Sequence, residues 1–70
     1  MKFNEWLMLT MEEKGMSQRA LSRKTHMPQD SISNYCCGYR RPGLPNTVRM
    51  CRALDVDMNV LKEVEWIDYR

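Results

Sequence analysis

The chain has 70 residues, of which 43% are hydrophobic and 29% are charged, and its net charge is +2 at pH 7. This length allows one domain with a small core, and the hydrophobic fraction argues against global disorder. No apolar run reaches the length of a membrane span and no signal-peptide pattern opens the chain, so we expect a cytoplasmic protein without a membrane segment.

The three cysteines argue against two common roles for this residue. An odd count is atypical of a secreted disulfide framework, and Cys36 and Cys37 are neighbours in a predicted helix, where a disulfide would be strained. The chain has no Cys-x-x-Cys spacing and only one histidine, so we expect no metal site, although a redox switch stays open. Cys51 is expected to be a small buried apolar group.

Nothing in the sequence indicates catalysis. One histidine, His26, cannot supply the nucleophile, base and acid of a hydrolase, and no glycine-rich phosphate loop is present. The acids Glu12 and Glu13 are side by side at the end of a predicted helix. We therefore expect a binding protein that is not an enzyme and needs no cofactor.

The first predicted helix covers residues 3–14, with Phe3, Leu7, Thr10 and Lys14 along one row. It is unusually apolar on its other sides as well, through Trp6, Met8, Leu9 and Met11. A helix that is hydrophobic nearly all round is normally covered on more than one side. Either this helix has a second contact surface, or these side chains form a loosely packed, methionine-rich local core.

Two short helices joined by a tight corner are predicted next. Ser17 is a good N-cap for a helix over residues 17–25, and Pro28 both ends that helix and opens another over residues 28–37. Gly38 is the C-cap candidate of the second helix. Along that helix, Ile32 and Tyr35 recur on one face. The opposite face carries short polar side chains suited to contact base edges, namely Gln29, Asp30, Ser33 and Asn34.

The rest of the chain is predicted to contain two further helices. A loop over residues 38–45 holds two glycines and two prolines and is followed by a helix from about Pro45 to Leu54. Asp57 is the N-cap candidate for a fifth helix, in which Met58 and Leu61 are the expected core contacts.

This arrangement resembles the helix-turn-helix of the phage Cro/repressor (XRE-like) family of DNA-binding proteins. The resemblance rests on Gly15-Met16-Ser17-Gln18, Ala20-Leu21, Met27, Ile32-Ser33 and the G-x-R-x-P segment from Gly38 to Pro42. It implies an all-α, five-helix lambda-repressor-like domain over residues 1–63. It also implies a sequence-specific transcription regulator, in the manner of a Cro-like repressor from a phage or bacterium, that binds double-stranded DNA as a homodimer and occludes a promoter.

Three positions depart from the family pattern. Ser22 stands where the family usually has alanine, and Thr25 stands where it usually has a large apolar residue. His26 stands where the family usually has glycine at the turn, so His26 is predicted to adopt a positive φ.

The family's DNA contacts can be carried over to matching positions. The resemblance implies base contacts by Gln29, Asp30, Ser33 and Asn34. It implies backbone contacts by Gln18, Tyr39, Arg40, Arg41, Arg19 and Lys24, together with backbone N–H groups near Cys37 and Gly38. Asp30 has an alternative interpretation, because an anion in the first turn also favours the helix dipole. His26 is either a phosphate contact or a surface turn residue.

The charge distribution agrees with a DNA-binding surface. Residues 14–52 contain eight basic residues against Asp30 alone, a net charge of +7, whereas residues 1–13 carry −2 and residues 53–70 carry −3. A basic block over the predicted helix-turn-helix is typical of a phosphate-binding face. A solvated basic surface without a ligand is the alternative.

The C-terminal tail, residues 64–70, is rich in apolar surface through Trp66, Ile67 and Tyr69. Either the tail folds back onto the domain, or it pairs with a second copy of the chain. The resemblance implies dimerisation through this segment. As an alternative function, the same fold could bind another regulator through its first helix or its tail.

Overall fold

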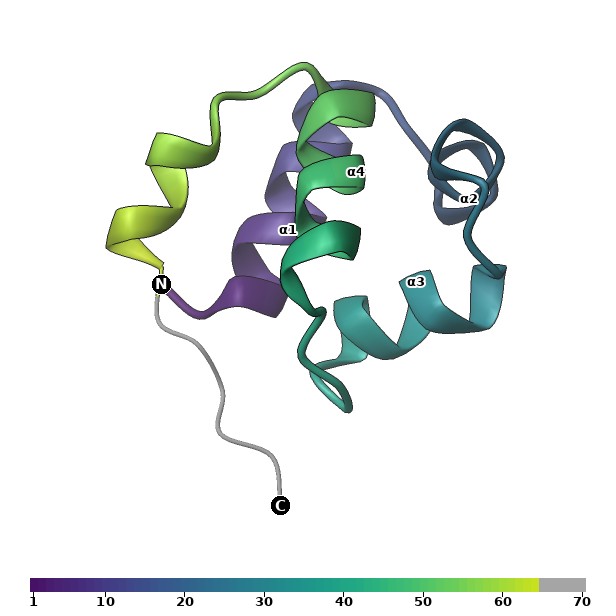
Figure 1. Ribbon diagram of the computed structural model, residues 1–70, viewed down its shortest axis with the longest axis horizontal. Helices are drawn as coiled ribbons and strands as arrows, with labels where there is room; N and C mark the ends of the chain where they lie inside the picture. The colour runs from purple at the N-terminus through teal and green to yellow at the C-terminus, as the bar shows by residue number, and fades with distance from the viewer. Residues whose placement is uncertain (65–70) are drawn as a thin grey trace.

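The computed structural model describes residues 1–64 and consists of four α-helices followed by a short 3-10 helix (Figure 1). The elements are α1 (Phe3–Glu13), α2 (Gln18–Thr25), α3 (Gln29–Cys37), α4 (Leu44–Leu54) and η1 (Met58–Glu63). Within the described residues there is no strand, and no helix is long and apolar enough to cross a bilayer. The all-helical prediction is therefore confirmed.

The ends of the four α-helices lie within one residue of the predicted positions because local capping chemistry sets them. The Ser17 side chain caps the start of α2, because it accepts a hydrogen bond of 3.1 Å from the backbone N–H of Ala20. Gly38 ends α3 with φ at 80°, a left-handed conformation that glycine adopts without a Cβ clash. Pro28 immediately precedes α3, as its dual role at the corner requires.

The core is built from every helix of the domain. Its most deeply buried side chains are Leu7, Leu21, Ile32, Met50, Cys51 and Leu54. α3 packs against both α1 and α2, and α2 also packs against α4, so α3 is held in place by two other helices. Figure 1 shows α3 crossing near the start of α4, with its outer side turned away from the remaining helices.

The apolar character of α1 is divided between core and surface. Phe3, Leu7 and Met11 are buried, while Trp6 is half-buried and packs against the core. Met8 and Leu9 retain 55% and 47% of their surface exposed. Met8 and Leu9 therefore form an uncovered apolar strip on α1. This strip is consistent with the predicted second contact surface.

The prediction of a fifth α-helix was wrong, because residues 58–63 form the 3-10 helix η1 instead. The N-cap prediction was right, since the Asp57 carboxylate accepts from the N–H of Asn59 at 2.9 Å. Apolar residues recur here every three positions, at Met58, Leu61 and Val64. A helix with three residues per turn aligns that spacing on one side, and Leu61 and Val64 are buried in this way.

The corner between α2 and α3 is stabilised by Ser22. His26 adopts the predicted positive φ, at 57°, and its N–H donates to the Ser22 carbonyl. The Met27 N–H donates to the same carbonyl at 3.2 Å, and the Ser22 hydroxyl donates to the carbonyl of Met27. The buried Thr25 hydroxyl donates to the Leu21 carbonyl at 2.7 Å. Serine and threonine thus replace the usual small and apolar residues without unpaired polar groups.

Candidate nucleic-acid interface

α3 presents a polar face because its apolar residues are all on the inner side. Ile32 is fully buried and Tyr35 is 6% exposed, and the Tyr35 hydroxyl accepts from the Asn46 amide of α4 at 3.1 Å. The four predicted base-contacting residues share the outer side. Gln29 and Asp30 are exposed, and Ser33 and Asn34 are half-buried. The structure therefore brings together the predicted base contacts on one helix whose orientation is fixed by packing.

The loop after α3 carries three exposed side chains suited to contact phosphates: Tyr39, Arg40 and Arg41. Tyr39 keeps 73% of its surface exposed although it is a large aromatic residue. The loop begins directly at the end of α3, so it lies next to the C-terminal end of that helix. A DNA duplex against α3 would meet these side chains at its edge, where contacts fix register without reading sequence.

The first three backbone N–H groups of this loop already have partners in the protein. The N–H groups of Tyr39 and Arg40 both donate to the carbonyl of Asn34, at 2.9 and 3.3 Å, and the Gly38 N–H donates to the Tyr35 carbonyl at 3.3 Å. These bonds satisfy the last carbonyls of α3. The DNA backbone would accordingly be held by the side chains of the loop rather than by its amides.

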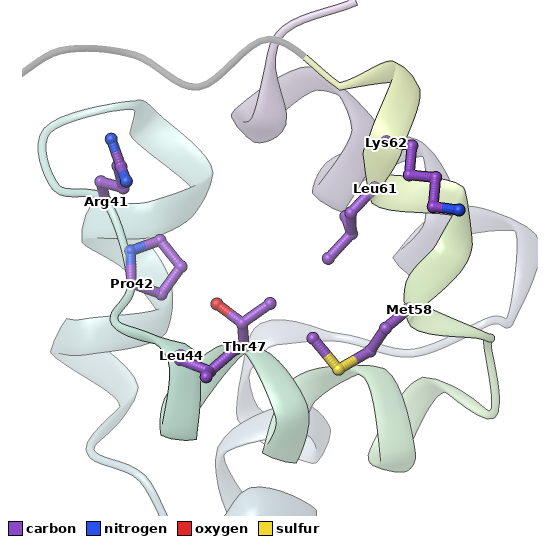
Figure 2. Close-up of a pocket in the computed structure, with 7 residues that line it drawn as sticks. All are labelled: Arg41, Pro42, Leu44, Thr47, Met58, Leu61 and Lys62. Carbon is purple, nitrogen blue, oxygen red and sulfur yellow. The ribbon is translucent and has the colours of Figure 1, made fainter.

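The loop after α3, with Arg40 and Arg41, is called the arginine loop below. A groove of about 380 Å³ adjoins it, between the start of α4 and η1. Figure 2 shows Arg41 and Pro42 on one side and Lys62 on the other. The apolar lining comes mainly from Pro42, Leu44, Met58 and Leu61. Leu44 is 70% exposed, so much of this lining is uncovered. Lys62 adds a second cation at the rim of the groove. It was not predicted from the sequence, because no local pattern marks it.

The predicted backbone contacts on α2 fall at opposite ends of that helix. Gln18 and Arg19 lie in the first turn, half-buried and exposed respectively. Lys24 lies in the last turn, and its ammonium group donates to the Ala53 carbonyl of α4 at 3.5 Å. Six residues of helix separate Lys24 from Gln18, roughly 9 Å along the axis.

Lys24 also belongs to a second basic cluster, which was not predicted from the sequence. A pocket of about 450 Å³ lies between the ends of α2 and α4, lined by Lys24, Thr25, His26, Arg49, Arg52 and Ala53. Arg49 and Arg52 are three residues apart on α4, a spacing that places both on one face of the helix. That spacing was the available signal for this cluster.

The cysteines are all free thiols with different environments. Cys36 and Cys51 are buried, which confirms the expectation for Cys51, and Cys37 is exposed on α3. Burial, assisted by the neighbouring Cys37, raises the pKa of Cys36 to about 11. Burial and then the Asp57 carboxylate raise the pKa of Cys51. Both buried thiols are therefore in their neutral, protonated form at pH 7.

Comparison with known proteins identifies the family that this geometry suggests. A family model described as helix-turn-helix matches residues 7–61, well over half of the chain. The matched part includes the polar face of α3, the arginine loop and both ends of α2. No curated protein and no solved structure matches the chain.

Proposed function

We propose that this chain, which belongs to the Cro/C1-type (XRE-like) helix-turn-helix family of DNA-binding transcription regulators, represses transcription as a homodimer. The observation that carries the proposal is the exposed polar face of α3 beside the arginine loop. In each protomer α3 enters the major groove of double-stranded DNA, and the two half-sites are about one helical turn, roughly 34 Å, apart. The bound dimer occludes a promoter of a phage or bacterial genome and acts through binding alone.

Base readout is assigned to the outer face of α3. Gln29 and Asn34 can each form paired hydrogen bonds with the N6 and N7 edge of adenine, and Asp30 can accept from the amino group of cytosine. Ser33 can contact either base type. Gln18, Arg19 and the three exposed loop side chains hold phosphates on either side of the groove.

Selection of binding sites from random duplex DNA, at two salt concentrations, tests the function directly. The proposal expects an enriched palindrome and an affinity that falls steeply with salt, because each phosphate contact releases condensed counterions. Absence of enrichment, with weak binding at both salt concentrations, would exclude sequence-specific regulation.

Replacing Gln29 with alanine is expected to relax sequence preference at one base pair in each half-site. Loss of a paired contact with adenine costs roughly 1–3 kcal/mol of discrimination per half-site. Gln18→Ala is the matched control, because loss of a phosphate contact lowers the affinity for all sequences equally. Site selection with both variants distinguishes the two roles, and unchanged preference in Gln29→Ala would remove this residue from base readout.

Dimerisation is assigned to the C-terminal tail, whose residues Trp66, Ile67 and Tyr69 lie outside the described residues. Because Val64 is only 8% exposed and packs in the core, truncation is best placed after Val64. The chain of residues 1–64 is expected to keep its fold and to sediment as a monomer. It should also lose most of its affinity for the palindrome, while retaining weak binding to a half-site. Sedimentation and circular dichroism of the same sample measure both properties.

A second candidate function is supported by the uncovered apolar strip of α1. Met8 and Leu9 are large apolar side chains of α1 that are about half exposed, and contact with another protein would cover them. If the 1–64 chain still sediments as a dimer, the interface moves to this strip, and Leu9→Arg should then dissociate it. If the 1–64 chain and the full chain are both monomers, the strip is left for a different regulator.

A further inference from the structure

Four sulfur-containing side chains converge on one small pocket that the DNA-binding function does not explain. The pocket has a volume of about 290 Å³ and lies where α1, the loop after α1 and α3 meet. Its lining residues are Met8, Met11, Glu12, Met16, Ser17, Gln18 and Cys36. The chain has seven methionines and three cysteines in all, so four of its ten sulfur atoms belong to the seven residues of this pocket.

The two innermost sulfur atoms already have the separation of two ligands on one metal ion. Cys36 Sγ lies 3.8 Å from Met11 Sδ, and both residues are at most 5% exposed. Two sulfur ligands with bonds of about 2.3 Å and a tetrahedral angle lie roughly 3.8 Å apart. In the structure the Cys36 thiol donates to the Met11 sulfur at this distance, and a bound ion would replace that proton between the two sulfur atoms.

The other two sulfur residues can complete the coordination from the pocket mouth. Met16 is half-buried and is held near Met11, since its N–H donates to the Met11 carbonyl at 2.8 Å. Met8 is one helical turn before Met11 and is 55% exposed, so its flexible thioether is free to turn inward. The Glu12 carboxylate belongs to the same lining and would attract a cation towards it.

We propose that this pocket binds one Cu(I) ion through the Cys36 thiolate and the thioether of Met11, with Met8 and Met16 completing the site. Thiolate and thioether ligands select soft ions such as Cu(I), whereas hard ions prefer oxygen ligands. On binding, the Cys36 S–H bond breaks, an S–Cu bond forms and the proton passes to water, with no change in the oxidation state of copper.

The test uses the full-length reduced chain with Ag(I) as a stable probe of Cu(I) sites. The exposed Cys37 is first replaced by serine, because any accessible thiol binds this ion. With methyl-labelled methionine, one equivalent of Ag(I) is expected to shift the NMR signals of Met8, Met11 and Met16. The signals of Met27, Met50 and Met58, which do not line the pocket, should stay in place. Competition with a Cu(I) chelator then repeats the measurement for copper itself.

Matched variants in the same background assign the ligands. Met11→Leu keeps a similar side-chain volume without a sulfur atom and is expected to lower the affinity by more than about tenfold, since even outer-shell changes cost that much. Met27→Leu, at another buried methionine, should leave the affinity unchanged. Cys36→Ser should abolish the three methyl shifts. The proposal is overturned if these methyls do not move, or if Met11→Leu and Met16→Leu both bind like the parent, which would show that these thioethers are not ligands.

Discussion

Replacing both Arg40 and Arg41 with alanine is expected to weaken operator binding by roughly a hundredfold per half-site at physiological salt. Each arginine is exposed on the loop beside α3, and a hydrogen bond to a charged group contributes about 1.5–3 kcal/mol, or tenfold at the lower limit. The slope of log affinity against log salt should also become shallower by about 4, since the dimer loses four phosphate contacts and each removes roughly 0.9. Fluorescence anisotropy titrations over a range of salt concentrations measure both quantities.

The double variant Arg49→Ala with Arg52→Ala is the matched control for this experiment. It also removes two positive charges, but from the exposed face of α4, in the cluster that contains Lys24 and His26. If the arginine loop holds the duplex, the control should keep most of the salt slope of the parent. Equal losses in the two variants would show that affinity depends on total charge, and a larger loss in the control would move the duplex to the α4 side.

The parts of the fold that were predictable from sequence depend on interactions between close neighbours in the chain. The Ser17 cap is three residues from its donor, and the Asp57 cap is two residues from its donor. Gly38 and His26 have left-handed conformations set by the turns in which they stand. Because these effects are local, the ends of the α-helices and the polar face of α3 followed from the residues alone.

The features that escaped prediction depend on residues brought together by tertiary packing. Lys24 meets Ala53 across 29 positions of the chain, and Cys36 meets Met11 across 25. From the sequence, the backbone N–H groups near Gly38 were predicted to contact phosphate. Their hydrogen bonds to the last carbonyls of α3 depend on the conformation of the loop after Gly38, which no local pattern predicts. The 3-10 helix is a partial exception, since the spacing of Met58, Leu61 and Val64 contained a signal with a period of three.

Replacing Ile32 with alanine is expected to destabilise the domain by about 2–5 kcal/mol. Ile32 is fully buried at the centre of α3, and truncation of such a side chain loses its transfer free energy and leaves a cavity. At roughly 0.05–0.15 kcal/mol per residue, a chain of this length has a total stability of only about 3.5–10 kcal/mol. Much of the variant should therefore be unfolded near physiological temperature, and urea denaturation followed by circular dichroism measures the loss.

Ser33→Ala, at the next position of the same helix, separates folding from DNA binding. Ser33 is half-buried on the outer face, and alanine has a higher helix propensity, so the free energy of unfolding should stay within about 0.5 kcal/mol of the parent or rise slightly. The affinity for the operator should nevertheless fall by about fivefold per half-site, the equivalent of one neutral hydrogen bond of about 1 kcal/mol in each. Ile32→Ala should show the opposite pattern at low temperature, where its folded fraction binds DNA with an affinity close to that of the parent. If Ser33→Ala unfolds the domain while Ile32→Ala loses only DNA binding, the two faces of α3 have been assigned the wrong way round.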